Sequence, residues 1–236
     1  MFSGTAINNL NQCINWKIEQ NQSLYGTFSD CSNLTNIYGI KDWNVSNVTS
    51  FNDLFENCTG LEDITPLSNW KTTSAKSLNY MFSGCTSIKD ITPLKNFNVD
   101  KVTELTYFLY KHNLEEIDLT NWNTRNCKNF SYAFSTTSNK FKRLILTNWD
   151  FSSATNLSNF LGSNKYISDI IGPIYNISTD VKLSSNQGLT KDSAMVFING
   201  LSNVEVPKTI TFYSTVKNQL TEDQIAIATE KGWTVA

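Results

Sequence analysis

The stretch DWNVSNVTSFNDLFENCTGLEDI, residues 42–64, decides the fold because its pattern returns along most of the chain. Its tryptophan belongs to an aromatic column with intervals of 27, 27, 27, 25 and 27 residues: Trp16, Trp43, Trp70, Phe97, Trp122 and Trp149. A second column holds phenylalanine at intervals of 26 or 27 residues: Phe28, Phe55, Phe82, Phe108, Phe134 and Phe160. A third holds a cysteine three residues after its phenylalanine: Cys31, Cys58 and Cys85. Three columns with one period predict a repeat array, whose units bury apolar faces against their neighbours.

Each repeat has two halves with different apolar spacing. In the first half, Val48, Phe51 and Phe55 are separated by steps of three and four, which predict a short helix or helical turn. The second half follows the pattern L-x-x-I-x-x-L at residues 61–67, which predicts the short strand of a leucine-rich repeat. We therefore expect an α/β fold: a right-handed leucine-rich-repeat solenoid of about six coils of 25–27 residues.

Residues 42–64, together with YMFSGCTSIKDI at residues 80–91, resemble the BspA-like leucine-rich repeats of bacterial and phage surface proteins. The resemblance covers about residues 1–176, and some units depart from it: Phe97 replaces tryptophan, and His112, Ser138 and Asn164 fall near the cysteine position. The letters MFSG occur at residues 1–4 and again at 81–84, which places Met1 and Phe2 in true repeat positions. The resemblance implies a recognition or structural role at a surface.

The last fifty residues do not follow the repeat pattern of the earlier columns. Thr190 is a good N-cap for a helix with Ala194, Phe197 and Leu201 on one face, and residues 208–213 alternate as a strand. Residues 221–224, TEDQ, form a capping box for a second helix, which Gly232 ends before a strand at 233–235. We therefore divide the chain into a repeat domain, residues 1–186, and a helix–strand–helix–strand cap, residues 187–236. The cap resembles C-terminal modules of phage tail-associated proteins.

Composition excludes several classes of function. The net charge is 19 − 21 = −2 and the basic residues are scattered, so we expect no nucleic-acid partner. No apolar run approaches the roughly 20 residues that cross a bilayer, and residues 1–15 do not read as a signal peptide, so we expect no membrane insertion. With a single histidine, His112, and no nucleophile–base pair or metal-ligand spacing, we expect neither an enzyme nor a cofactor or metal site. The five cysteines are expected to be buried free thiols.

The candidate binding surface is the outward side of the predicted strands, because side chains alternate between the two faces of a strand. It comprises Asn36, Tyr38, Asp63, Asp90, Glu116, Asp118, Arg143 and Asp169. We expect a non-enzymatic recognition or structural protein of a phage particle, which binds a partner protein or a host-surface glycan or protein, with homo-oligomers possible in a larger assembly. It would be assembled in the host cytoplasm and carried on the virion. The alternative is a fragment of an adhesin at a bacterial cell surface.

Overall fold

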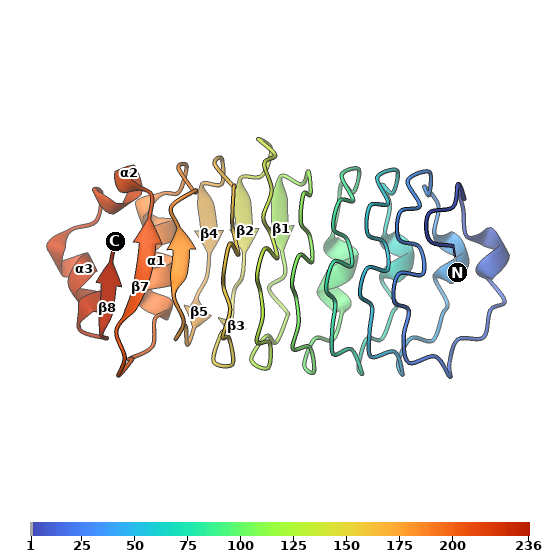
Figure 1. Ribbon diagram of the computed structural model, residues 1–236, viewed down its shortest axis with the longest axis horizontal. Helices are drawn as coiled ribbons and strands as arrows, with labels where there is room; N and C mark the ends of the chain where they lie inside the picture. The colour runs from blue at the N-terminus through green and yellow to red at the C-terminus, as the bar shows by residue number, and fades with distance from the viewer. Residues whose placement is uncertain (1) are drawn as a thin grey trace.

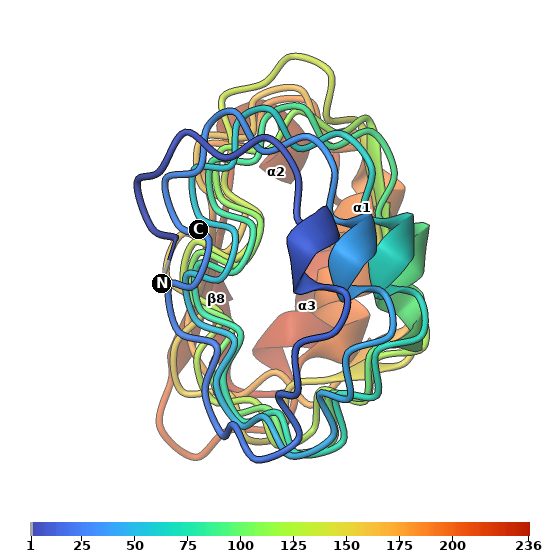
Figure 2. The same ribbon diagram turned by 90° about the vertical axis from the view of Figure 1, so that its right-hand side faces the viewer.

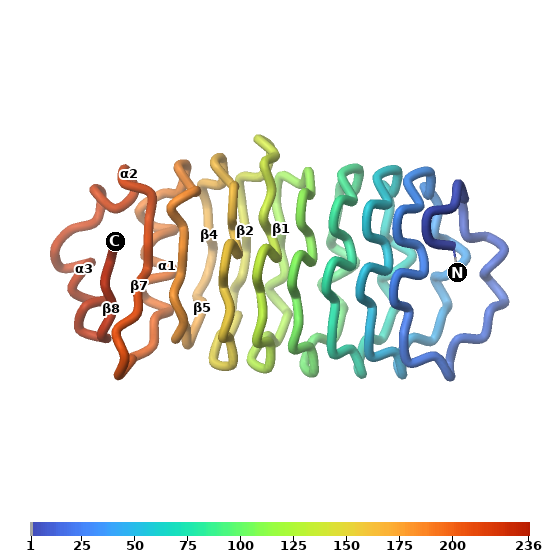
Figure 3. The backbone as a smooth tube through the Cα atoms, viewed as in Figure 1, coloured from blue at the N-terminus to red at the C-terminus, as the bar shows by residue number. Residues whose placement is uncertain are grey.

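The computed structural model describes residues 2–236, and the chain winds repeatedly so that successive windings lie side by side along the long axis (Figure 1). The amino terminus lies at one end of this row and the carboxyl terminus at the other, as the backbone tube also shows (Figure 3). In the first four windings, the regular elements among the described residues are short 3₁₀ helices: η1 (Asn11–Cys13), η2 (Tyr38–Ile40), η3 (Thr65–Leu67) and η4 (Thr92–Asn96).

Strands and α-helices begin only after residue 115. The strands are β1 (Glu116–Asp118), β2 (Arg143–Ile145), β3 (Trp149–Asp150), β4 (Asp169–Ile171), β5 (Ile174–Tyr175), β6 (Val181–Leu183), β7 (Lys208–Phe212) and β8 (Trp233–Val235). They form three parallel sheets, with strand orders β1-β2-β4, β3-β5 and β6-β7-β8. The α-helices are α1 (Lys191–Gly200), α2 (Ser214–Lys217) and α3 (Glu222–Thr229).

The prediction of a leucine-rich-repeat solenoid is wrong. That fold requires one strand in every repeat and one continuous sheet, whereas residues 65–67 and 92–96 form 3₁₀ helices and the strands are divided among three short sheets. The helix expected around Phe51 and Phe55 is also absent, because residues 52–57 form a series of turns. The chain is instead a mixed fold with few helices and short parallel sheets.

Hydrogen bonds between windings explain why the first half of each repeat is not helical. The backbone N–H groups of Phe51, Asp53 and Phe55 donate to carbonyl oxygens 26 residues later, at 3.0, 2.9 and 3.0 Å. The N–H of Leu54, between them, donates to Phe51 at 3.3 Å and closes a turn. Asp53 has a φ of 55°, in the left-handed region that Asp and Asn tolerate better than most residues. A helix would need all these N–H groups for bonds within one segment.

These bonds between windings lie on one side of the molecule. Along the same side, isolated parallel bridges join successive windings at Ser23, Ser50, Ser77, Glu104, Asn129 and Asn156. Figure 2 looks along the row and shows α1 and the early 3₁₀ helices on one side, with β8 on the opposite side. We call the side that carries η1–η4 and β1, β2 and β4 the helical wall, and the opposite side the bridged wall.

The core lies between these two walls and is built from the repeat columns. Phe55 stacks between Phe28 and Phe82, with ring centroids 5.7 and 5.6 Å apart. Trp43 and Trp70 stack at 6.4 Å, and all five of these aromatic side chains are buried. Aromatic pairs at such distances add stability beyond the burial of their area.

The C-terminal elements follow the sequence prediction closely. The Thr190 side chain accepts the N–H of Ser193 at the start of α1, and the Thr221–Gln224 capping box is present at the start of α3. Strands β7 and β8 pair in parallel, with Lys208 opposite Trp233 and Ile210 opposite Val235.

At the amino terminus, the prediction for Met1 lies outside the described residues. Phe2 does occupy its repeat position, because its ring stacks on Phe28 at 5.8 Å and on Trp16 at 5.6 Å.

Candidate functional site

The eight predicted binding residues lie in order along the outside of the helical wall. Register in the first sheet places Glu116 beside Arg143 and Arg143 beside Asp169. Asn36, Tyr38 and Asp63 line a hollow of about 300 Å³ between η2 and η3. Asp90, Glu116 and Asp118 line a larger groove, described below. The structure thus brings the residues together in one row, although only β1, β2 and β4 contribute strands to it.

Several members of this row hold the backbone in shape. The side-chain oxygens of Asn36, Asp63 and Asp90 each accept the backbone N–H two residues later, at 2.8 Å in all three cases. Such Asx turns fix the chain just before the 3₁₀ helix that follows. Asp118 makes the same contact with the N–H of Thr120 at 3.1 Å. A structural role therefore accounts for part of the acidic character of the row.

Opposite charges from neighbouring windings offset the repulsion expected between the carboxylates. Lys89 pairs with Glu62, and Lys95 pairs with Asp118. Farther along, a guanidinium nitrogen of Arg143 lies 3.1 Å from a carboxylate oxygen of Glu116. The row is consequently a surface of mixed charge rather than a simple acidic strip.

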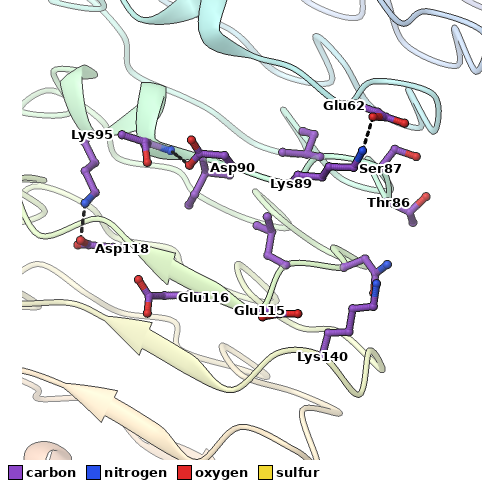
Figure 4. A pocket seen from close by; sticks show the side chains of 15 residues that line it. Glu62, Thr86, Ser87, Lys89, Asp90, Lys95, Glu115, Glu116, Asp118 and Lys140 are labelled. Carbon is purple, nitrogen blue, oxygen red and sulfur yellow. Dashed lines mark hydrogen bonds and ion pairs between the residues drawn. The ribbon is translucent and has the colours of Figure 1, made fainter.

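A groove with a volume of about 580 Å³ opens on this row between the windings of η4 and β1 (Figure 4). Its apolar lining comes from Ile88, Ile91 and Leu114, which are all buried. Its remaining lining residues carry hydroxyl, amide, carboxylate or ammonium groups: Glu62, Thr86, Ser87, Lys89, Asp90, Thr92, Lys95, Asn113, Glu115, Glu116, Asp118 and Lys140. The volume lies within the range of small-ligand sites.

Two carboxylates of the groove, Asp90 and Asp118, are held in their charged form. Hydrogen bonds from the Thr92 side chain and backbone keep the pKa of Asp90 below its ordinary value. Partial burial raises the pKa of Asp118, but hydrogen bonds from Lys95 and Thr120 outweigh it, so that the pKa of Asp118 is also lowered. The groove therefore keeps these two negative charges at neutral pH.

Sequence reasoning found three residues of the groove and missed the others. Glu62 and Lys89 are 27 residues apart, which is one full repeat, so their opposite charges could have been predicted to meet. Glu115 and Lys140 gave no such signal, because Lys140 lies outside the repeat columns. The groove itself depends on the local spacing between two windings, which no motif records.

His112, the single histidine, lies in the core. It is 2% exposed, its ring packs edge-on against Phe141 at 4.5 Å between centroids, and burial lowers its pKa to about 3. Among residues 2–236, no group of three His, Cys, Asp or Glu side chains is arranged to hold a metal ion. In the same part of the chain, no helix is both long and apolar enough to cross a membrane.

Comparison with known proteins identifies one family. The family model described as Mycoplasma protein of unknown function, DUF285, matches residues 1–113 and 65–173, which together span 173 of the 236 residues. No curated protein matches the chain. The chain therefore belongs to the family described as Mycoplasma protein of unknown function, DUF285.

Proposed function

We propose that this protein is a non-enzymatic recognition protein, which binds a partner protein or a host-surface glycan or protein through the outside of its helical wall. The observation that supports this most is the groove of about 580 Å³ on that wall, which combines apolar residues with ammonium, carboxylate and hydroxyl groups. Such a combination provides area for contact and directional groups for specificity.

The architecture suits recognition because it displays side chains from successive windings in fixed rows. Bridges and turns on the opposite wall join neighbouring windings, and the aromatic columns fill the space between the two walls. A binding surface on such a framework loses little conformational entropy when a partner arrives. Rigid presentation of a row of polar groups is the physical basis of the proposal.

The pKa shifts of Asp90 and Asp118 favour binding over glycoside hydrolysis, the enzyme class closest to a paired-carboxylate surface. Hydrolysis of a glycosidic bond needs one carboxylic acid that stays protonated, with a raised pKa. The pKa values of Asp90 and Asp118 are lowered instead. The charge of Asp90, which has no ion-pair partner among the described residues, suits recognition of a cationic group.

Two settings fit a recognition role. The resemblance of the C-terminal cap to phage tail-associated modules supports a virion component, whereas the family description, which names Mycoplasma, supports a bacterial source and so favours the alternative of a cell-surface adhesin. Mass spectrometry of purified virions and surface proteolysis of intact cells separate the two. Detection in virions supports the first setting, and loss of the protein from protease-treated intact cells supports the second.

Binding to intact host cells, followed by flow cytometry with labelled protein, tests the recognition role. The groove variant combines Glu115→Gln, Glu116→Gln and Lys140→Gln, three exposed positions. The matched control combines Glu205→Gln, Glu230→Gln and Lys182→Gln, which are exposed and lie outside the groove. We expect at least a tenfold loss of binding for the groove variant and none for the control. Equal binding by both variants would overturn the proposal for this wall.

A further inference from the structure

Residues 87–91 form one side of the groove, and their backbone N–H groups make no bonds to a neighbouring winding. None of these five consecutive N–H groups has an acceptor within residues 2–236. In an earlier winding, the N–H groups of Thr35 and Asn36 both donate to the carbonyl oxygen of Asn8, at 3.0 and 3.2 Å, whereas the equivalent N–H groups of Glu62 and Asp63 have no acceptor within the described residues. Backbone groups without protein partners need water or a ligand.

The other side of the groove is the free edge of a sheet. The order β1-β2-β4 leaves β1 with a neighbour on one side only. Toward β2, the carbonyl oxygen of Glu115 accepts the N–H groups of Lys142 and Arg143, and the N–H of Leu119 donates to Ile145. Bonding groups of successive residues in a strand point in opposite directions, so the N–H and C=O groups of Glu116 and Asp118 face the groove.

The two sides are therefore unpaired backbone segments that run along one groove without bonding to each other. Direct pairing of strands needs a spacing of about 4.8 Å. The absence of any bond between residues 87–91 and β1 in the described chain shows that these two segments do not pair directly. A chain segment within the groove could use bonding groups from either side.

The charges in the groove indicate the chemistry of such a segment. Lys89 and Lys95 are already paired with Glu62 and Asp118, and Lys140 is the one ammonium group of the lining without an ion-pair partner among residues 2–236, against two unpaired carboxylates. The carboxylates of Asp90 and Glu115 have no ion-pair partner in the described residues, and Asp90 keeps its negative charge at neutral pH. An incoming basic side chain would complement these two carboxylates.

We infer that the groove binds an extended peptide segment of a partner protein, by main-chain hydrogen bonds to residues 87–91 and to the edge of β1, with a Lys or Arg of the peptide beside Asp90 and Glu115. This inference rests on the proposed recognition function and specifies its partner. Addition of an extended peptide to a free sheet edge is a common mode of peptide recognition. A polysaccharide is the weaker fit, because no aromatic ring lines the groove for a sugar to stack on.

The first experiment selects peptides from a displayed random heptapeptide library on the immobilised full-length protein and measures their affinity by fluorescence polarisation. Enriched peptides should contain Lys or Arg, and the double variant Asp90→Asn/Glu115→Gln should bind them at least tenfold more weakly. Asn at position 90 keeps a side-chain oxygen for the Thr92 N–H, so the turn is preserved. N-methylation of alternate peptide amides should also weaken binding at least tenfold, whereas equal binding of the methylated peptide would overturn main-chain recognition.

The second experiment measures amide hydrogen exchange by NMR. The amides of residues 87–91, Glu116 and Asp118 should exchange rapidly in the free protein and slowly with the selected peptide. Slow exchange of these amides in the free protein, or protection elsewhere on binding, would overturn the inference.

The outcomes for the two proposals are distinct. If no peptide is enriched but cell binding still depends on the groove, or if a glycan array gives groove-dependent binding, the peptide inference fails and the recognition function stands. If cell binding does not depend on the groove and no peptide is enriched, both proposals fail.

Discussion

The Sγ atom of Cys85 lies 2.9 Å from the backbone carbonyl oxygen of Phe55, thirty residues earlier in the chain. Cys58 makes the same contact with the carbonyl of Phe28, at 3.1 Å. Asn164 takes the equivalent position in a later winding and donates its side-chain amide to the carbonyl of Phe134 at 2.9 Å. The cysteine column is thus a column of hydrogen-bond donors between windings, and its members are replaceable by other donors.

Removal of the donor at position 85 should destabilise the protein more than its conservative exchange. Cys85→Val removes the bond to Phe55, and we expect it to lower the free energy of unfolding by about 1 kcal/mol, the usual contribution of one hydrogen bond. Cys85→Ser keeps a hydrogen-bond donor and should lower the free energy of unfolding by a smaller amount. Urea unfolding of both variants provides the measurement. A valine variant as stable as the serine variant would show that the thiol contributes only its volume.

The thiols should be unreactive in the folded protein. All five cysteines are free and buried, and burial raises the pKa of Cys58 to about 12, so its thiol stays protonated at pH 8. Iodoacetamide at pH 8 without reductant should leave the native protein unmodified and add five carbamidomethyl groups in urea. Fewer than five additions in urea would reveal a disulfide, such as one between Cys31 and Cys58.

Gly39 is required by the close approach of two windings. A Cβ at this position would lie 1.8 Å from the backbone carbonyl oxygen of Leu10, so Gly39→Ala forces the backbone to shift. We expect a loss of at least about 2 kcal/mol, as for overpacked core sites. Gly26 has a φ of 56° and open space at its Cβ position, so Gly26→Ala should cost only about 1 kcal/mol through its left-handed backbone. The two variants, compared by urea unfolding, separate steric overlap from backbone strain. Equal losses would contradict the close contact at Gly39.

The period and the buried columns could be predicted from the sequence for a simple reason. Residues such as Phe55 and Trp70 recur at one period, and equivalent positions in stacked windings have equivalent environments. The secondary structure could not be predicted in the same way. The spacing of Val48, Phe51 and Phe55 is that of a helix, yet the N–H groups of Phe51 and Phe55 bond to the next winding. Backbone hydrogen bonds to residues 26 positions away cannot be recognised from the local spacing of apolar residues.

The candidate site could likewise be predicted only in part from the sequence. The outward position of Asp90 and Glu116 followed from the repeat, and both lie on one surface. The sequences around these two residues are alike, but Glu116 belongs to a strand and Asp90 does not. The difference depends on whether a neighbouring winding is close enough to pair, which is a tertiary property. The groove lies beside β1, where strand pairing on the helical wall begins, and for that reason it could not be predicted.

The indole of Trp70 combines burial with a bond between windings. Its Nε1 donates to the carbonyl oxygen of Ile40 at 3.0 Å, and its ring stacks on Trp43. Trp70→Ala should lower the free energy of unfolding by about 3–5 kcal/mol. Trp70→Phe keeps an aromatic ring but loses the bond, as Phe97 does naturally in this column, and should cost about 1–2 kcal/mol. Urea unfolding followed by circular dichroism measures both losses, and equal losses would mean that ring stacking adds nothing.

His112 should make the protein sensitive to acid. Burial lowers its pKa to about 3 in the folded protein, against about 6.5 in the unfolded chain, so the unfolded state binds the proton more tightly. The full contribution of the neutral ring is therefore present above pH 6.5, and stability falls by about 1.4 kcal/mol for each pH unit below 6.5 until pH 3. At pH 5 the loss from this residue should reach about 2 kcal/mol. His112→Asn places at this position the residue type found at the equivalent Asn164, and it cannot titrate. Urea unfolding of both proteins at pH 7 and pH 5 should show a smaller decrease for the variant, since the carboxylates titrate alike in both. An identical decrease would mean that His112 is protonated in the folded protein and reaches solvent.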